Sequence, residues 1–411
     1  MKNLIKTKLA ALALALTTAV PSLHAQQLTL PTTDVSDGAL NITVSTTIDL
    51  SRAVTVNNWT NSNTGTNVGN GVYDPAQWAV VFKYSSVYIA SNATVTFINN
   101  QTHAPVVWLV NGNVTINGTV NLDGQAGNNT GNNTDPNNLA EPGPGGFRGG
   151  GNIINGGGSG YGPGGGFSGY NSGIYSGSYG NPQIIPLIGG SGGSGFNGWN
   201  GNAGGGAILI AATGTMNLTN GNLHATGGYN FGNSGRGSGG AIRLVAYQIS
   251  GNGSTSISAL GGNGDNTIAG IIRLETISVV GSPNVSPTTQ AVTPDSPVKI
   301  FPATNAPTVT ILNVTTKPVS ADPKAVMSVN VNADDVTLVT TNAVTIQLQT
   351  QNFPTNGTVS VYIKPRNNGS QTILTALFDN GTTNSAYWHV STTLLYPGQP
   401  AHTVIQARAS F

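Results

Sequence analysis

The amino-acid sequence predicts an all-β fold: a right-handed parallel β-helix (solenoid) with a long glycine-rich insert, followed by a small β-sandwich domain. Two stretches of equal length, residues 205–228 (GGAILIAATGTMNLTNGNLHATGG) and 239–262 (GGAIRLVAYQISGNGSTSISALGG), open and close on paired glycines. Apolar residues alternate along both, which is typical of strands with one buried face. Beyond residue 307 the pattern changes to strands separated by Asn, Gly and Pro turns.

The repeat defines the solenoid. The two stretches align without gaps, so that Ile208 lies over Ile242 and Leu223 over Ile257, and weaker copies occupy residues 79–97, 105–124 and 270–281. Three short strands in every 26–34 residues make about one turn of a parallel β-helix. Such a turn can bury its apolar face only against its neighbours. We therefore expect these side chains to share one core: Ile208, Ile210, Ile242, Leu244, Ile257 and Ile272.

The composition agrees with stacked strands. Only 7% of the residues are charged, whereas ordinary soluble domains have roughly 25%. In a parallel stack each residue type lies about 4.8 Å from its counterpart, so that equal charges would repel each other. Asn and Thr can instead hydrogen-bond from one turn to the next. There is no cysteine, so we expect a fold that is stable without disulfides.

The first 25 residues are predicted to be a signal peptide. Lys2, Lys6 and Lys8 precede an apolar run, and Ala25 is a small residue suited to cleavage. Removal of this segment leaves 12 basic against 14 acidic residues, a net charge of −2. No basic surface for nucleic acid is therefore expected, and no transmembrane span in the mature chain. The predicted localisation is secreted or cell surface.

The predicted β-helix, residues 26–280, contains an insert at residues 125–203. Residues 143–206 include 28 glycines and a single charged residue, Arg148. A loop of this length inside a compact domain is usually functional or disordered. We expect the insert to form an ordered flap whose aromatic side chains pack on the β-helix.

A second domain is predicted after a linker. Residues 281–307 contain six prolines and are interpreted as a Pro-rich linker. Residues 308–411 then show alternating strands typical of an immunoglobulin or fibronectin type III (Ig/Fn3-like) β-sandwich, without the Cys…Trp…Cys pattern. In its last strand, Ile405, Ala407, Ala409 and Phe411 are expected on one face.

The segments GGGAILIAA, GGAIRLVA and NGNVTINGTVNLDGQ, together with the glycine-rich insert, give the chain a family resemblance. Over residues 40–280 it resembles the glycine-rich parallel β-helix proteins of the bacterial exterior, which overlap with adhesins and filamentous-haemagglutinin-like proteins. The resemblance implies a structural or adhesive role outside the cell. The Asn-Pro-Asn-Gly signature of two-partner secretion is missing, so their export route is not implied.

No catalytic, cofactor-binding or metal-binding residues are predicted, because the histidines and carboxylates show no repeated spacing. One column is notable: Trp108, Leu209, Arg243 and Arg273 are expected at the same outward position of the first strand in four turns. Either aromatic residues of the insert cover this column, or the column forms part of a platform for sugars. In the second case the candidate glycan contacts are Trp108, Tyr170, Tyr175, Tyr179, Trp199, Arg243 and Arg273.

The expected function is that of an exported, non-catalytic structural or adhesive protein. Its expected partners are extracellular polysaccharide or cell-surface components. One alternative is a carbohydrate-binding protein that uses the aromatic residues of the insert. The other is a polysaccharide lyase or hydrolase, which is disfavoured because acidic residues do not pair at the repeat spacing.

Overall fold

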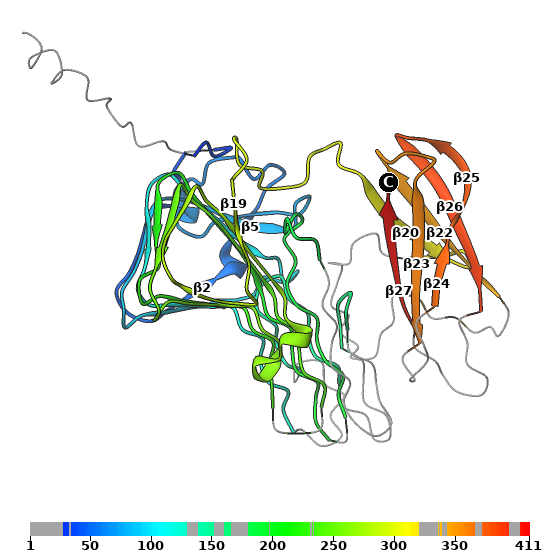
Figure 1. Cartoon of the computed structure of the whole chain (residues 1–411), viewed down its shortest axis with the longest axis horizontal. Coiled ribbons are helices and arrows are strands. Elements are labelled where there is room, and N and C mark those ends of the chain that lie inside the picture. Colours follow the sequence, from blue (N-terminus) through cyan, green and yellow to red (C-terminus); the bar gives the residue numbers. More distant parts are fainter. Residues whose placement is uncertain are drawn as a thin grey trace, which may run out of the picture.

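The computed structural model is all-β and has large parallel sheets (Figure 1). It describes residues 28–32, 34–129, 139–151, 160–165, 180–196, 198–230, 232, 234–319, 336, 338, 343–365, 372–393 and 403–411. The predicted signal peptide lies outside these residues.

The N-terminal part, here called the parallel-strand unit, extends to residue 301. It contains the following elements: β1 (Gly38–Ile42), β2 (Thr46–Asp49), η1 (Leu50–Arg52), β3 (Val54–Thr55), η2 (Gly65–Asn67), β4 (Val72–Asp74), β5 (Ala79–Ile89), β6 (Thr94–Ile98), β7 (Val106–Val110), β8 (Val114–Ile116), β9 (Thr119–Asn121), β10 (Ala207–Ala212), β11 (Thr215–Asn217), β12 (Asn222–His224), β13 (Ala241–Val245), β14 (Gln248–Gly251), β15 (Ser256–Ser258), η4 (Gly262–Gly264), η5 (Asn266–Ile268), β16 (Ile271–Glu275), β17 (Ser278–Gly281), β18 (Asn284–Ser286) and β19 (Ala291–Val292).

Equivalent strands of successive repeats pair in parallel. The large sheet bends at β5, because the first half of this strand pairs with β7 and its second half with β8. One arm continues through β7, β10, β13, β16 and β19, and the other through β8, β11, β14 and β17. A separate sheet in the order β18-β15-β12-β9-β6-β2 completes a three-sided outline in Figure 1.

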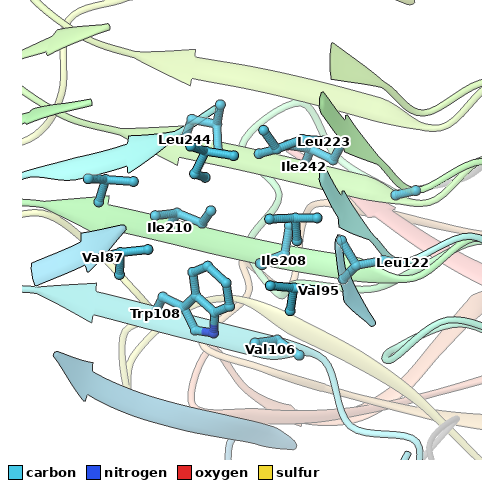
Figure 2. Close-up of a cluster of buried hydrophobic side chains, with 14 of the residues drawn as sticks. Val87, Val95, Val106, Trp108, Leu122, Ile208, Ile210, Leu223, Ile242 and Leu244 are labelled. Atoms are coloured by element: carbon cyan, nitrogen blue, oxygen red, sulfur yellow. The ribbon is translucent and has the colours of Figure 1, made fainter. Parts of the chain in front are cut away.

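The predicted core is confirmed. Ile208 lies beside Ile242 and Ile242 beside Ile272, as the gap-free alignment requires. Figure 2 shows Ile208, Ile210, Ile242 and Leu244 pointing into one cluster. All six expected side chains are buried in that cluster, which contains residues from all three sides of the unit.

The expected outward position of Trp108 is wrong. Trp108 pairs with Ile210, while the partner of Leu209 is Val107. The indole therefore points into the core (Figure 2) and is completely buried. A slip of one residue exchanges the two faces of a strand. The sequence could not resolve it, because all five residues of β7 are apolar and the strand is buried on both faces.

Glycine-rich segments without strand pairing form a second structural layer, here called the glycine bundle. It comprises residues 122–129, 140–151, 160–165, 187–196, 198–206, 225–230, 232, 234–240 and 259–270. Segment 189–195 exchanges backbone hydrogen bonds with segments 145–151, 200–206 and 234–240. The bonds recur every third residue, as in Phe147 N→Gly190 O and Gly150 N→Gly193 O. This period matches the three residues per turn of a polyproline II helix, in which successive amides point to different neighbours.

The described part of the insert packs on the parallel-strand unit as expected of the flap, since Phe147 lies in the core cluster and Tyr161 packs against it, but it does so as part of a larger layer. Besides the insert, the segments between β12 and β13 and between β15 and β16 also run into it (Figure 1). Paired glycines at the ends of the repeats are therefore packing positions. At Gly240, a Cβ atom would overlap the carbonyl oxygen of Gly206.

The Pro-rich segment does not leave the parallel-strand unit at residue 281. Strands β18 and β19 pair with β15 and β16, and Val298 and Ile300 are buried. The expected linker thus contains part of this unit.

The C-terminal part consists of two antiparallel sheets. The five-stranded sheet has the order β21-β20-β22-β26-β25, and the three-stranded sheet β24-β23-β27. Both contribute side chains to a third buried cluster. Ile405, Ala407 and Ala409 pack against it as expected. Phe411 lies beyond the last strand and is largely exposed, but its ring packs edge-on against Phe353 of this cluster, on the expected face. The strands are β20 (Thr308–Val314), β21 (Lys317–Pro318), β22 (Val344–Gln351), β23 (Thr358–Pro365), β24 (Thr372–Thr375), β25 (Leu377–Thr382), β26 (Ser385–Thr392) and β27 (Thr403–Ser410).

A Gly240→Ala substitution tests the glycine bundle. The added methyl group meets backbone on a neighbouring segment, which cannot rotate away. We expect a loss of about 1–3 kcal/mol or more in the free energy of unfolding, measured by urea denaturation. Gly253→Ala is the matched control, because its Cβ would meet nothing within 4 Å. Equal denaturation midpoints for the two variants would contradict the packing described.

Candidate functional site

The outer face of the arm β5, β7, β10, β13 and β16 is covered. Val107 and Leu209 lie in a second apolar cluster on this side. The cover comes from several separate segments: Leu30 near the N-terminus, Val56 and Trp59 before β4, Ile184 and Leu187 of the insert, and Val298 and Ile300. Of the two alternatives expected for the column that contains Leu209, the first was that aromatic residues of the insert cover it. The column is covered, but mostly by aliphatic residues.

Arg243 and Arg273 hold this cover through a shared carboxylate. Glu275 Oε1 accepts hydrogen bonds from Arg243 Nε at 2.8 Å and from Arg273 Nε at 2.6 Å. Arg243 also donates to the carbonyl oxygen of Lys299, and Arg273 to that of Pro182. Arg243 and Glu275 are almost completely buried. The two arginines therefore connect the sheet to the covering segments.

These contacts determine which of the candidate glycan-contacting residues are accessible to a sugar. Trp108 and Arg243 have no accessible surface for a sugar, because the first points into the core and the second is enclosed with Glu275. Arg273 and Trp199 are partly exposed. The indole of Trp199 packs against the backbone of Gly232 in the glycine bundle. Tyr170, Tyr175 and Tyr179 lie outside the described residues.

A buried lysine at the N-terminal end was not anticipated. Lys83 Nζ donates to Asp34 Oδ2 at 2.9 Å and to the carbonyl oxygens of Thr60 and Asn61. Asp37 accepts from the backbone N–H of Lys83 and from Asn63. These bonds attach the segment before β4 to the outer face of β5. The available signal was a lysine within the apolar run AVVFKYSS.

A second charged cluster joins the glycine bundle to the strands. Glu141 Oε1 lies 2.5 Å from His103 Nε2, and Glu141 Oε2 lies 2.7 Å from Arg148. Burial alone would raise the pKa of Glu141. Hydrogen bonds from His103 and Asn99 and the charges of His103 and Arg148 outweigh it and lower that pKa to about 2. The Glu141 carboxylate is thus held as an anion between two segments.

The other two sides of the parallel-strand unit present small polar residues. On the six-stranded sheet, Thr119, Asn222, Ser256 and Asn284 form one outward column. On the arm β8, β11, β14 and β17, Thr115, Asn217 and Ser250 form another. Apart from β2, which carries Asp49 at the end of the six-stranded sheet, none of these strands contains Asp, Glu, Lys or Arg: β6, β8, β9, β11, β12, β14, β15, β17 and β18. We call these two sides the polar faces.

The described part of the chain contains no group of three or more His, Asp or Glu side chains placed to hold a metal ion. Within the same residues, none of the helices has the length and apolar character needed to cross a membrane.

A Glu275→Gln substitution tests the buried ion cluster. It leaves Arg243 buried beside Arg273 without a carboxylate, and breaking a buried pair in this way costs about 3–5 kcal/mol. We expect a corresponding decrease in the free energy of unfolding by urea. The control is Asp295→Asn, which removes the exposed ion pair with Lys299 and should cost about 0–1 kcal/mol. Unfolding of Glu275→Gln at the urea concentration of the parent would contradict the role given to this cluster.

The Glu141 carboxyl group predicts a pH dependence. Its pKa is lowered in the folded chain from 4.5 to about 2, so its contribution to stability is present above pH 4.5 and is lost as the pH falls toward 2. We expect Glu141→Gln to have a lower thermal midpoint than the parent at neutral pH. The difference should shrink through that interval. A difference that is constant from pH 6 to pH 2 would show that the carboxylate charge contributes nothing.

Comparison with known proteins adds no relative: no protein-family model, curated protein or solved structure matches this chain.

Proposed function

We propose that this chain is an exported, non-catalytic structural and adhesive protein that acts at the cell surface or outside the cell. In this proposal the parallel-strand unit is a right-handed parallel β-helix, and the C-terminal sheets form an Ig/Fn3-like sandwich. The parallel register of equivalent strands in successive repeats supports the first assignment. The buried cluster shared by the two antiparallel sheets supports the second.

The observation that carries the functional proposal is the pair of polar faces. Their strands hold Ser, Thr and Asn in columns that continue from repeat to repeat, and apart from Asp49 at the end of β2 they contain no Asp, Glu, Lys or Arg. Side chains of this kind make many short-range hydrogen bonds and no long-range charge attraction. Such a surface suits extended contact with a neutral partner, which is what adhesion to a cell wall or matrix requires.

The carboxylates support a structural assignment over the alternative of a lyase or hydrolase. Glu141, Asp265 and Glu275 each form an ion pair with arginine. Glu275 is enclosed between the sheet and its cover. These carboxylates join segments of the chain, whereas a general acid or base must lie within hydrogen-bond reach of a substrate.

Expression of the full chain in a bacterial host, with and without residues 2–25, tests this proposal. We expect cleavage after Ala25, seen by mass spectrometry, and surface exposure, seen by protease treatment of intact cells. Cells that carry the chain should adhere to polysaccharide-coated plates, and 1 M salt should not reduce adhesion.

The polar faces can be tested in the same assay. A double variant Asn222→Lys/Ser256→Lys places two like charges side by side on one polar face and should reduce adhesion. Gln290→Lys, at an exposed position between β18 and β19, is the control. Retention inside the cell with an intact N-terminus, or adhesion that is lost in salt, would overturn the proposal.

A further inference from the structure

The outward side of the five-stranded C-terminal sheet carries a compact set of side chains that no contact in the described part of the chain covers. The register of β22, β26 and β25 places Gln347, His389 and Leu377 in one row across the sheet. A second row contains Gln349, Tyr387 and Asn380. Neighbouring strands lie about 4.8 Å apart, so the two rows form a flat array. We call these six residues the β25–β26 face.

Two apolar side chains are exposed among the polar residues of this face. Leu377 is 63% exposed and Tyr387 41%. Contiguous exposed apolar groups on a soluble protein often mark a binding site. An exposed tyrosine offers both an apolar ring and a hydroxyl group, which suits a ligand with apolar and polar surfaces.

The strands beneath the face are firmly held. Trp388, which alternates with Tyr387 and His389 along β26, is buried and donates from Nε1 to Thr350 Oγ1 at 2.9 Å. The ring of Phe378 packs edge-on against Trp388 with centroids 5.2 Å apart. The face is therefore preorganised, which lowers the entropy lost when a ligand binds.

The polar groups on the face are positioned to form hydrogen bonds with the hydroxyl groups of a neutral ligand. Asp379 Oδ1 lies 2.5 Å from His389 Nδ1, so these two side chains hold each other in position. Gln349 donates to Ser385, and Gln347 accepts from Asn313. Carboxamides and a fixed carboxylate pair well with the adjacent hydroxyl groups of a sugar. Strands β22, β25 and β26 contain no lysine or arginine, so nothing on them attracts an acidic polymer.

We propose that the β25–β26 face binds a neutral polysaccharide. The ring of Tyr387 stacks against the C–H face of a sugar unit, Leu377 extends this apolar contact, and Asp379, His389 and Gln347 bind hydroxyl groups. The inference rests on the proposed adhesive function and gives it a ligand class. It places sugar recognition in the C-terminal sheets and not in the insert.

Purified mature chain (residues 26–411) provides the test. Cellulose, chitin, xylan and galactomannan serve as neutral probes, and polygalacturonate as the acidic one, in pull-down and affinity electrophoresis. We expect at least one neutral polymer to retain the chain in both low and high salt. Tyr387→Ala should weaken this binding at least tenfold, and Tyr387→Phe should largely restore it, because the ring is kept. Gln347→Ala should produce a smaller loss.

Ile373→Ala is the control, because Ile373 is also exposed, 55%, but lies on β24 of the three-stranded C-terminal sheet, away from both the β25–β26 face and the polar faces. It should bind like the parent. All variants should keep the parent's thermal midpoint, since the altered side chains lie outside the buried clusters. Retention by polygalacturonate alone, no retention by any polymer, or unchanged binding of Tyr387→Ala would each overturn the inference. The inference would also be overturned if the chain bound a peptide strand along the edge of β25 and no sugar on the face.

The two proposals fail separately. Binding is measured on purified chain, so that failed export leaves this result untouched. Conversely, a chain that is exported and whose polymer binding is lost in Asn222→Lys/Ser256→Lys but unchanged in Tyr387→Ala overturns only the inference on the β25–β26 face.

Discussion

Parallel pairing of each strand with its counterpart one repeat away is the constraint on which the rest of the structure depends. With neighbours about 4.8 Å apart, every side chain lies against a residue at the same position of the next repeat. Ile208, Ile242 and Ile272 consequently form a continuous inward column. On the polar faces, the same spacing permits Ser, Thr and Asn and penalises repeated charge. The low charge of the sequence and its apolar core thus have one physical origin.

In the glycine bundle, which is not built from strands, close packing of neighbouring segments likewise restricts which residue types fit. Its segments approach so closely that a Cβ at Gly240 would overlap the carbonyl oxygen of Gly206. Hydrogen bonds in a three-residue period satisfy the amides that such close packing removes from water. The entropy lost in ordering so many glycines is offset by these bonds. Glu141 adds an ionic connection between the bundle and the residues after β6.

Charged residues are few, and where they occur inside the molecule they join separate segments. Lys83 fixes the segment before β4, and Arg243 and Arg273 reach the carbonyl oxygens of Lys299 and Pro182. The side of the parallel-strand unit that these ions hold is closed to ligands. In the function proposed here, recognition falls to its other two sides and to the outward face of the C-terminal sheet, where Tyr387 is exposed.

The sequence by itself determined the all-β class, the positions of most strands, and the inward column of the repeats, because apolar alternation and repeat length are local properties. Tertiary structure determined the features that the alternation of apolar and polar residues cannot predict. Trp108 lies in a strand that is apolar on both faces, so only the register showed which face it joins. From the sequence, Arg243 was expected to be available for a ligand. In the structure it is covered by segments distant in sequence, including the one that contains Lys299. The glycines looked like turn residues, and their role depends on backbone contacts between distant segments. The candidate face around Tyr387 likewise requires three strands in register, and this pairing is a long-range property that no single stretch of sequence contains.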